Sequence, residues 1–120
     1  MNDSTSAISI RVGASGATTM INLFTVEPGD QDELVRLEVT GMTEIASTMP
    51  GFVRGSIHRS LDGTRLVNYI HWADGDAWRN AHEVLQANPE YREHMENVRR
   101  IATADPHPYE VIAVIDGAGA

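Results

Sequence analysis

The sequence predicts one α+β domain in which a four-stranded antiparallel sheet carries helices on one face. The main observation is the order of the strand and helix patterns, β-α-β-β-α(α)-β, which is the split, ferredoxin-like βαββαβ arrangement. The length of 120 residues suits a single domain. The composition, with 42% hydrophobic and 22% charged residues, is typical of a globular protein.

The first half of the predicted domain is a strand followed by a helix. Residues 19–26 (TMINLFTV) form the strand, which ends at Pro28-Gly29. Asp30 is expected to cap a helix that continues to about Thr48, before Met49-Pro50-Gly51 stops it. The apolar stripe of this helix consists of Leu34, Leu37, Gly41 and Ile45.

The second half begins with two strands, residues 52–60 and 64–73, joined by a Leu-Asp-Gly hairpin signal. Asp74 is expected to cap a second helix, and a third starts at Asn88-Pro89-Glu90. We expect Asp105-Pro106 to end the third helix and residues 109–115 to form the last strand.

The two ends are predicted to lie outside the domain core. Residues 1–18 are expected to be a flexible extension, although the alternating piece AISIRV could pair as an edge strand. The domain proper is placed at residues 19–116, and residues 117–120 are expected to fray.

Strand composition further predicts a homodimer. In residues 19–26 and again in 109–115, apolar side chains occur at both odd and even positions. A sheet that is apolar on both faces needs cover on both, and the helices of this chain can cover only one. The other face is therefore expected to pack against the sheet of a second copy.

Charge and missing residue types exclude several function classes. The net charge of −8, with no cluster of Lys or Arg, argues against nucleic acid. The absence of Cys excludes thiolate nucleophiles and thiolate metal sites, and the absence of Lys excludes Schiff-base and P-loop chemistry. No apolar run reaches membrane-spanning length and the N-terminus lacks a signal-peptide pattern, so a cytoplasmic location is expected.

The stretch 64–73 (TRLVNYIHWA) carries the candidate site. Because side chains alternate along a strand, Asn68 and Trp72 point to the same face. Asn22 occupies the matching position of the first strand, which neighbours this strand in a ferredoxin-like sheet. Two amides and an indole would then meet between sheet and helices. The alternative is that each Asn bonds irregular backbone or a buried water.

Histidine placement depends on the hairpin. If the hairpin loop has an odd number of residues, His58 lies on the same face as Asn68, whereas an even loop places it on the opposite face as an exposed strand residue. The five histidines show no His-x-His or His-x₃-His spacing, so no metal site is expected. His94 is expected to be a satisfied core histidine.

Three helix residues are candidate substrate contacts. Trp78 lies on the inward stripe of the second helix, where it is either core or the wall of a pocket. Tyr91 faces inward on the third helix. Arg92 either pairs with Glu96 on the surface or turns into the cavity to hold substrate oxygens.

The run from His58 to Asp74, HRSLDGTRLVNYIHWAD, with MINLFTV before it and AWRNAHEVLQANPEYREHM after it, resembles the antibiotic biosynthesis monooxygenase family. The likeness covers residues 20–115 and is strongest to the small cofactor-independent anthrone oxygenases of aromatic polyketide pathways. It implies a dimeric α+β barrel made of two ferredoxin-like protomers. It also implies a cavity in each protomer and oxygenation without flavin, haem or metal.

By position, the resemblance implies catalytic roles for Asn22, Asn68, Trp72 and His58 and a substrate contact for Arg92. Trp78 stands where a family member has Tyr, which removes a possible phenolic proton donor. The implied reaction oxidises an anthrone to a quinone with dioxygen as co-substrate, after deprotonation to an electron-rich enolate. Asn68 and Trp72 would stabilise the developing oxyanion, Asn22 would assist them, and His58 would be the base.

Three other functions stay open from the sequence. The same cavity could serve a cyclase or isomerase, or a dimeric protein that only binds a small ligand. Haem degradation is a weaker alternative, because no histidine is placed as an axial ligand.

Overall fold

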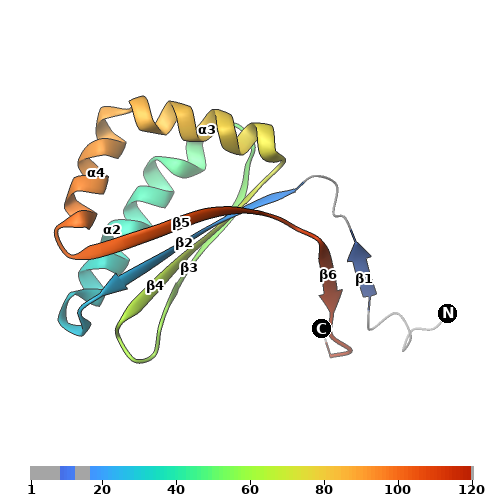
Figure 1. The fold of residues 1–120 in the computed structure, drawn as a ribbon, viewed down its shortest axis with the longest axis horizontal. Helices are drawn as coiled ribbons and strands as arrows, with labels where there is room; N and C mark the ends of the chain where they lie inside the picture. Colours follow the sequence, from blue (N-terminus) through green and yellow to red (C-terminus); the bar gives the residue numbers. More distant parts are fainter. Residues whose placement is uncertain (1–8, 13–16, 120) are drawn as a thin grey trace.

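The computed structural model describes residues 9–12 and 17–119, and their main body has the predicted ferredoxin-like fold. Between strands β2 and β5 the chain follows the expected order of strands and helices (Figure 1). The elements are β1 (Ser9–Val12), β2 (Thr18–Val26), a 3₁₀ turn (Pro28–Asp30), α2 (Gln31–Glu44), a second 3₁₀ turn (Ala46–Thr48), β3 (Phe52–Arg59), β4 (Arg65–Trp72), α3 (Gly75–Ala87), α4 (Pro89–Arg99), β5 (Ala102–Glu110) and β6 (Ala113–Asp116).

Four strands form an antiparallel sheet in the order β3-β4-β2-β5. The two central strands are β2 and β4, as the fold class requires, and their register places Asn22 opposite Asn68. The three helices cover one face of this sheet (Figure 1). The space between sheet and helices is therefore bounded by the middle of the sheet on one side.

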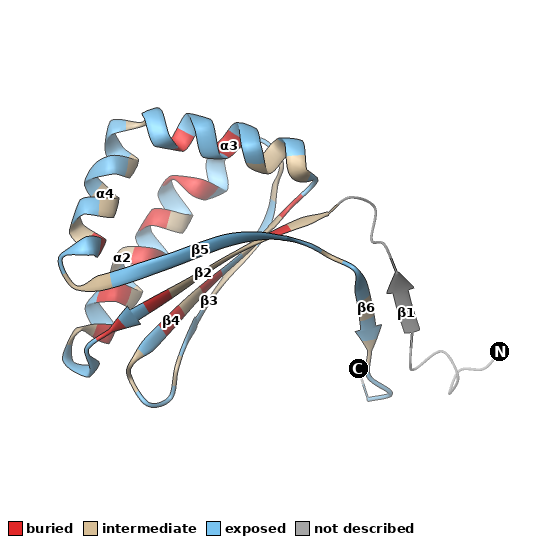
Figure 2. Cartoon of the chain, in the orientation of Figure 1, coloured by how far each residue is buried: buried red, intermediate tan, exposed pale blue. Residues whose placement is uncertain are grey.

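The hydrophobic core lies at one end of this space. Phe24, Leu34, Leu66 and Val98 are fully buried, and together they join β2, α2, β4 and α4. Burying each such side chain contributes roughly 1.5–3 kcal/mol. Figure 2 shows the buried residues gathered where the sheet meets the helices. The sheet and helices are thereby fixed relative to each other next to the candidate site.

One of the two predicted helix caps forms, and Asn88 supplies a further cap. Asp74 accepts a hydrogen bond from the Ala77 backbone N–H, and Asn88 caps α4 in the same way. Asp30 makes no side-chain cap bond, because the 3₁₀ turn before α2 leaves its backbone near helical values, at φ −106° and ψ −2°. The expected helix to Thr48 ends at Glu44, with one 3₁₀ turn after it.

The end of the third helix was predicted wrongly. The helix ends at Arg99, and β5 runs from Ala102 to Glu110 straight through Pro106 and Pro108. Proline lacks the N–H that a central strand needs, but β5 is an edge strand, and an edge leaves every second N–H unused. The predicted last strand, 109–115, is accordingly split between the end of β5 and β6.

Strands β1 and β6 form a separate antiparallel ladder, with Ile10 opposite Ile115. This ladder extends away from the main body (Figure 1). It realises the edge pairing that was the alternative for the piece AISIRV, whereas residues 1–8, 13–16 and 120 lie outside the described part. The proposed domain boundaries stay a prediction. Within residues 9–12 and 17–119, no helix is both long and apolar enough to cross a membrane.

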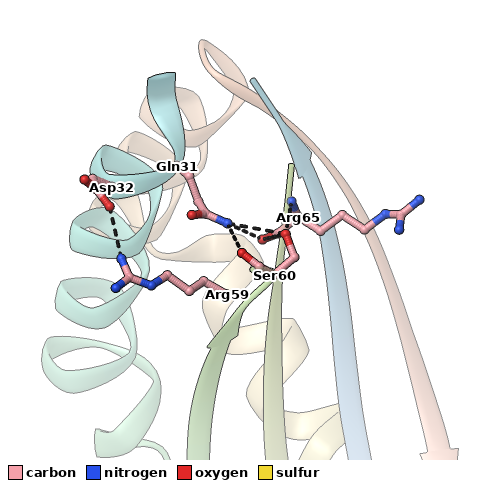
Figure 3. Close-up of polar contacts among 5 residues, drawn as sticks. All are labelled: Gln31, Asp32, Arg59, Ser60 and Arg65. Carbon is pink, nitrogen blue, oxygen red and sulfur yellow. Dashed lines mark hydrogen bonds and ion pairs between the residues drawn. The ribbon is translucent and has the colours of Figure 1, made fainter. Parts of the chain in front are cut away.

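A polar contact joins the start of α2 to the β3–β4 hairpin (Figure 3). The side-chain N–H groups of Gln31, a buried residue, donate to the backbone oxygens of Ser60 at 3.0 Å and Arg65 at 2.9 Å. Beside it, Arg59 pairs with Asp32 on the surface at 3.1 Å. We call the contact of Gln31 with Ser60 and Arg65 the hairpin bridge.

Candidate active site

A cavity of about 340 Å³ lies between the sheet and the helices. This volume is within the range of about 300–1,000 Å³ that is usual for small-molecule sites. The sheet supplies its floor through β2, β4 and Pro106 of β5, and the walls come from α2, α3 and α4. The lining residues include Met20, Asn22, Glu38, Gly41, Met42, Asn68, Ile70, Trp72, Trp78, Leu85, Tyr91, Arg92, His94 and Met95.

Asn22, Asn68 and Trp72 all line this cavity. The β2–β4 register brings the two asparagines together. Trp72 lies two residues after Ile70 on β4, so both side chains point to the same face of the sheet. Three of their polar atoms are buried without a hydrogen-bond partner among the described residues: Oδ1 of Asn22, Oδ1 of Asn68 and Nε1 of Trp72. Buried polar atoms in native proteins usually have partners. The floor thus presents two acceptors and one donor to a molecule in the cavity.

The indole of Trp72 is held in place by its neighbours. It is 2% exposed, and the Phe52 ring meets it edge-on with centroids 5.6 Å apart. Phe52 lies opposite Trp72 on β3, beside a register irregularity between Phe52 and Arg54. A fixed indole N–H is pre-oriented for a ligand oxygen.

A buried carboxylate, Glu38 of α2, stands beside Asn68. It is 4% exposed, one of its oxygens accepts a hydrogen bond from Nδ2 of Asn68, and its other oxygen lies 2.8 Å from Nε2 of His94 on α4. This contact of Glu38 with Asn68 and His94 is called the cavity bridge below. It uses one amide N–H of Asn68, which leaves Oδ1 as the atom without a partner.

Gly41 and Tyr91 lie next to the cavity bridge. Gly41 leaves room for the imidazole, since a Cβ at this position would stand 2.6 Å from Cε1 of His94. Tyr91 lies nearby, with ring centroids 6.2 Å from His94. Burial, assisted by the negative charge of Glu38, raises the pKa of Tyr91 above its ordinary value of 10.0. Tyr91 is therefore a neutral phenol at physiological pH.

The helix candidates form the outer wall. Trp78 is half-buried, lines the cavity and stacks on the exposed His82 with centroids 5.5 Å apart. Arg92 also lines the cavity, but it is exposed and its Nε donates to the backbone oxygen of Gln86 at 3.1 Å. Arg92 therefore stands at the rim, with part of its guanidinium available to a ligand.

His58 does not reach the cavity. Residue Ile57, and not His58, lies opposite Asn68, because the β3–β4 loop closes with an even number of residues between the paired Arg59 and Leu66. His58 is exposed on the uncovered face of the sheet, where its Nε2 bonds Oγ of Ser56 at 2.8 Å. The condition under which His58 was expected near Asn68 is not met, and it is not a candidate base within this protomer.

Sequence reasoning missed Glu38 and treated His94 as a core residue. A signal was present, since Gln31, Leu34, Glu38, Gly41 and Ile45 follow helical spacing and all five are buried. A carboxylate in the middle of such a stripe must face other buried residues, and buried carboxylates are rare unless paired. Its partner could not be identified without the tertiary structure, because His94 lies 56 residues away.

The chain is similar to a known protein family. Residues 18–97 match the sequence model of the antibiotic biosynthesis monooxygenase family. Tetracenomycin-F1 monooxygenase of Streptomyces glaucescens is 33% identical over 88 residues, which are 73% of this chain and 75% of that protein.

Two solved structures extend the likeness to the fold. A mutant of SnoaB, described as a cofactor-independent oxygenase from Streptomyces nogalater, has 28% identity and a TM-score of 0.67, covering 80% of this chain and 93% of that chain. The ActVA-Orf6 monooxygenase of Streptomyces coelicolor, in complex with the ligand nanaomycin D, has 28% identity and a TM-score of 0.65, covering 83% and 88%.

Proposed function

The chain belongs to the antibiotic biosynthesis monooxygenase family, and on that basis we propose that it oxidises an anthrone-type polyphenolic polyketide to a quinone with dioxygen and no cofactor. The reaction converts a CH₂ group to a carbonyl. One atom of dioxygen enters the product, and the other leaves as water with the two hydrogens of that carbon. The chemistry needs no external reductant, because the substrate enolate supplies the electrons.

The observation that carries the proposal is the set of unpartnered polar atoms on the cavity floor. An anthrone offers phenolic O–H donors to Oδ1 of Asn22 and of Asn68, and a carbonyl oxygen to the N–H of Trp72. When the substrate loses a proton, negative charge builds on that carbonyl oxygen. The Trp72 N–H, already fixed by Phe52, then strengthens its hydrogen bond as the charge develops.

The remaining cavity residues bind the flat, apolar part of the substrate. Trp78 forms a wall, Tyr91 offers a neutral hydroxyl, and Arg92 can hold a substrate oxygen at the rim. The same residues exclude water from the enolate. This supports a small aromatic substrate as the occupant.

The test is dioxygen consumption and product analysis with an anthrone panel. We expect the wild type to consume one dioxygen per quinone formed. Trp72→Phe is expected to lower turnover about 10²–10³-fold, as the loss of one preorganised hydrogen bond to a developing oxyanion typically does. Asn68→Ala removes the Oδ1 acceptor for a substrate O–H and the N–H that bonds Glu38, and it is also expected to lower turnover. Tyr69→Phe is the matched control, because Tyr69 neighbours Asn68 in β4 but lies on the opposite, exposed face.

The experiment also separates the rival functions. A product that forms equally well without dioxygen would indicate a cyclase or isomerase. Tight binding of the panel compounds with no turnover would indicate a binding protein. Wild-type rates for both Asn68→Ala and Trp72→Phe would refute the assignment of these residues.

We also propose that the uncovered face of the sheet packs on a second copy. Ile21 and Leu23 lie on this face of β2, and Tyr69 and Tyr109 on the same face are 40% and 49% exposed. Analytical ultracentrifugation is expected to return a dimer at micromolar concentration, and a monomer would contradict this. A cytoplasmic location is part of the same proposal.

A further inference from the structure

The cavity wall contains a buried acid–base pair, Glu38 and His94, to which the proposed function has assigned no role. Glu38 and His94 lie 2.8 Å apart, and their side chains retain only 5% and 12% of their exposure. Both line the cavity. They come from α2 and α4, so the pair bridges two walls directly above the Asn68 amide.

The chain maintains this pair at a cost in stability. A buried carboxylate loses its hydration, which is unfavourable unless hydrogen bonds replace it. Gly41, in the middle of α2, leaves the space that the imidazole fills, although Gly is a poor helix former. Such costs at one place are typical of a site that does chemistry.

The hydrogen bonds define which nitrogen can accept a proton. A carboxylate of Glu38 fixes the proton of His94 on Nε2, since Glu38 can only accept. Nδ1 then carries the free electron pair, and it bonds no residue in the part of the chain that the structure describes. An imidazole oriented by a carboxylate is the arrangement that other enzymes use as a general base.

Other proton acceptors around the cavity are less suitable. Tyr91 is held in its neutral form by burial and by Glu38. Glu96 and His82 are exposed, His82 is stacked on Trp78, and Arg92 has no basic electron pair. Among the described lining residues, Glu38 and His94 are the buried groups that can take up a proton.

We propose that His94 is the base of the reaction and that Glu38 positions it, an inference that rests on the proposed function. The C–H bond of the substrate breaks, its electron pair stays on the substrate as the enolate, and the proton forms a bond with Nδ1 of His94. Glu38 stabilises the imidazolium. The proton is later returned to the oxygen atom that leaves as water, which restores neutral His94.

The first experiment compares substituted enzymes with the same anthrone. We expect His94→Gln to lower kcat about 10²–10⁴-fold, the usual contribution of a general base, with a small change in KM. Glu38→Gln should lower kcat by less. The double variant should be no slower than His94→Gln, because the amide oxygen that replaces a Glu38 oxygen can still accept from Asn68, and the remaining role of Glu38 acts through His94. Additive losses would overturn the assigned roles.

His107→Gln is the matched control. His107 forms the same kind of pair with Asp105, at 2.9 Å, but on the uncovered face of the sheet and with both side chains more than half exposed. It should retain wild-type kcat. A His94→Gln variant that is folded, by circular dichroism, and as fast as wild type would overturn the inference while leaving the proposed function intact.

The second experiment needs no substrate. Nitrogen NMR of the resting enzyme should show that Nε2 of His94 carries the proton that faces Glu38, and that the Nε2 signal moves in Glu38→Gln. An Nε2 without a proton, or an Nε2 signal that Glu38→Gln leaves unchanged, would overturn the inference even if no anthrone of the panel were oxidised. Failure of the wild type on the whole panel would instead count against the proposed function.

Discussion

Two polar bridges start from α2, and they differ in what they leave unpaired. The hairpin bridge uses a neutral amide, Gln31, whose N–H groups bond two backbone oxygens. It leaves no buried side-chain atom without a partner among the described residues. The cavity bridge uses a carboxylate, and beside it lie three buried polar atoms that lack partners.

The difference separates a contact that supports the fold from one that serves chemistry. A satisfied amide bridge closes the hairpin onto the helix and contributes stability. A charged bridge next to unsatisfied donors and acceptors lowers stability, but it provides groups that a substrate can use. Four substitutions test this contrast.

The largest effect is expected from Gly41→Ala. The new Cβ would stand 2.6 Å from Cε1 of His94, so the imidazole must move away from its place beside Glu38. We expect kcat to fall roughly 10²-fold. Unfolding free energy should fall by up to about 2 kcal/mol, because the helix gains about 1 kcal/mol from Ala and loses about 1–3 kcal/mol to crowding.

Gly29→Ala is the control for this substitution, since no atom lies within 4 Å of a Cβ built there. Steady-state kinetics and urea unfolding should return wild-type values for it. A Gly41→Ala enzyme with unchanged kcat would mean that the position of His94 is unimportant.

Breaking the hairpin bridge should have the opposite signature. Gln31→Leu removes the donors to the Ser60 and Arg65 oxygens and leaves these oxygens without their helix partner. We expect a loss of about 1–3 kcal/mol in unfolding free energy, measured by urea denaturation, with kcat unchanged at a temperature where the protein is folded. A drop in kcat in the folded variant would remove the distinction between the two bridges.

Asn22→Leu should raise stability and lower activity. Its Oδ1 is buried without a partner, and Leu replaces this atom with an apolar group of similar size. We expect the unfolding free energy to rise by up to about 1 kcal/mol and the turnover of an anthrone to fall about tenfold. A variant that is less stable than wild type would show that Asn22 has a structural partner.

The smallest effect concerns Asp62, which lies in the hairpin loop. Hydrogen bonds from Thr64 and Ser60 lower the pKa of Asp62 from 3.8 to about 2. Because the folded state favours the ionised carboxyl, its stabilisation is complete above pH 4 and is lost as the pH falls through 2. Thermal unfolding of wild type and Asp62→Asn should therefore differ slightly at pH 7 and converge near pH 2. A difference that grew on acidification would contradict the assignment.

The fold, the family and the type of enzyme were predictable from local patterns. Turn signals and alternating strands set the order of elements, and the residues around Asn68 and Trp72 carried the family resemblance, which the family match confirms. The Asn22–Asn68 pairing followed from the fold class alone. These features depend on short stretches of sequence or on topology.

What the sequence could not supply depends on register and on distant contacts. His58 lies on one side of the sheet or the other depending on whether the hairpin loop has an odd or an even number of residues, and one residue more or fewer reverses the side. The pairing of Glu38 with His94 depends on how α2 and α4 pack. Asp105-Pro106 was predicted to end a helix, and only their place at the sheet edge makes Pro106 and Pro108 compatible with a strand.

Those two prolines also bear on how the protein behaves at high concentration. Since β5 is the outer strand of the sheet, Pro106 and Pro108 leave its free edge without N–H donors at two alternate positions. The loss of these two donors disfavours the addition of a strand from another molecule, which is one way natural sheets avoid fibrillar growth. Pro106 and Pro108 thus protect this edge of the sheet against the addition of a strand from another molecule.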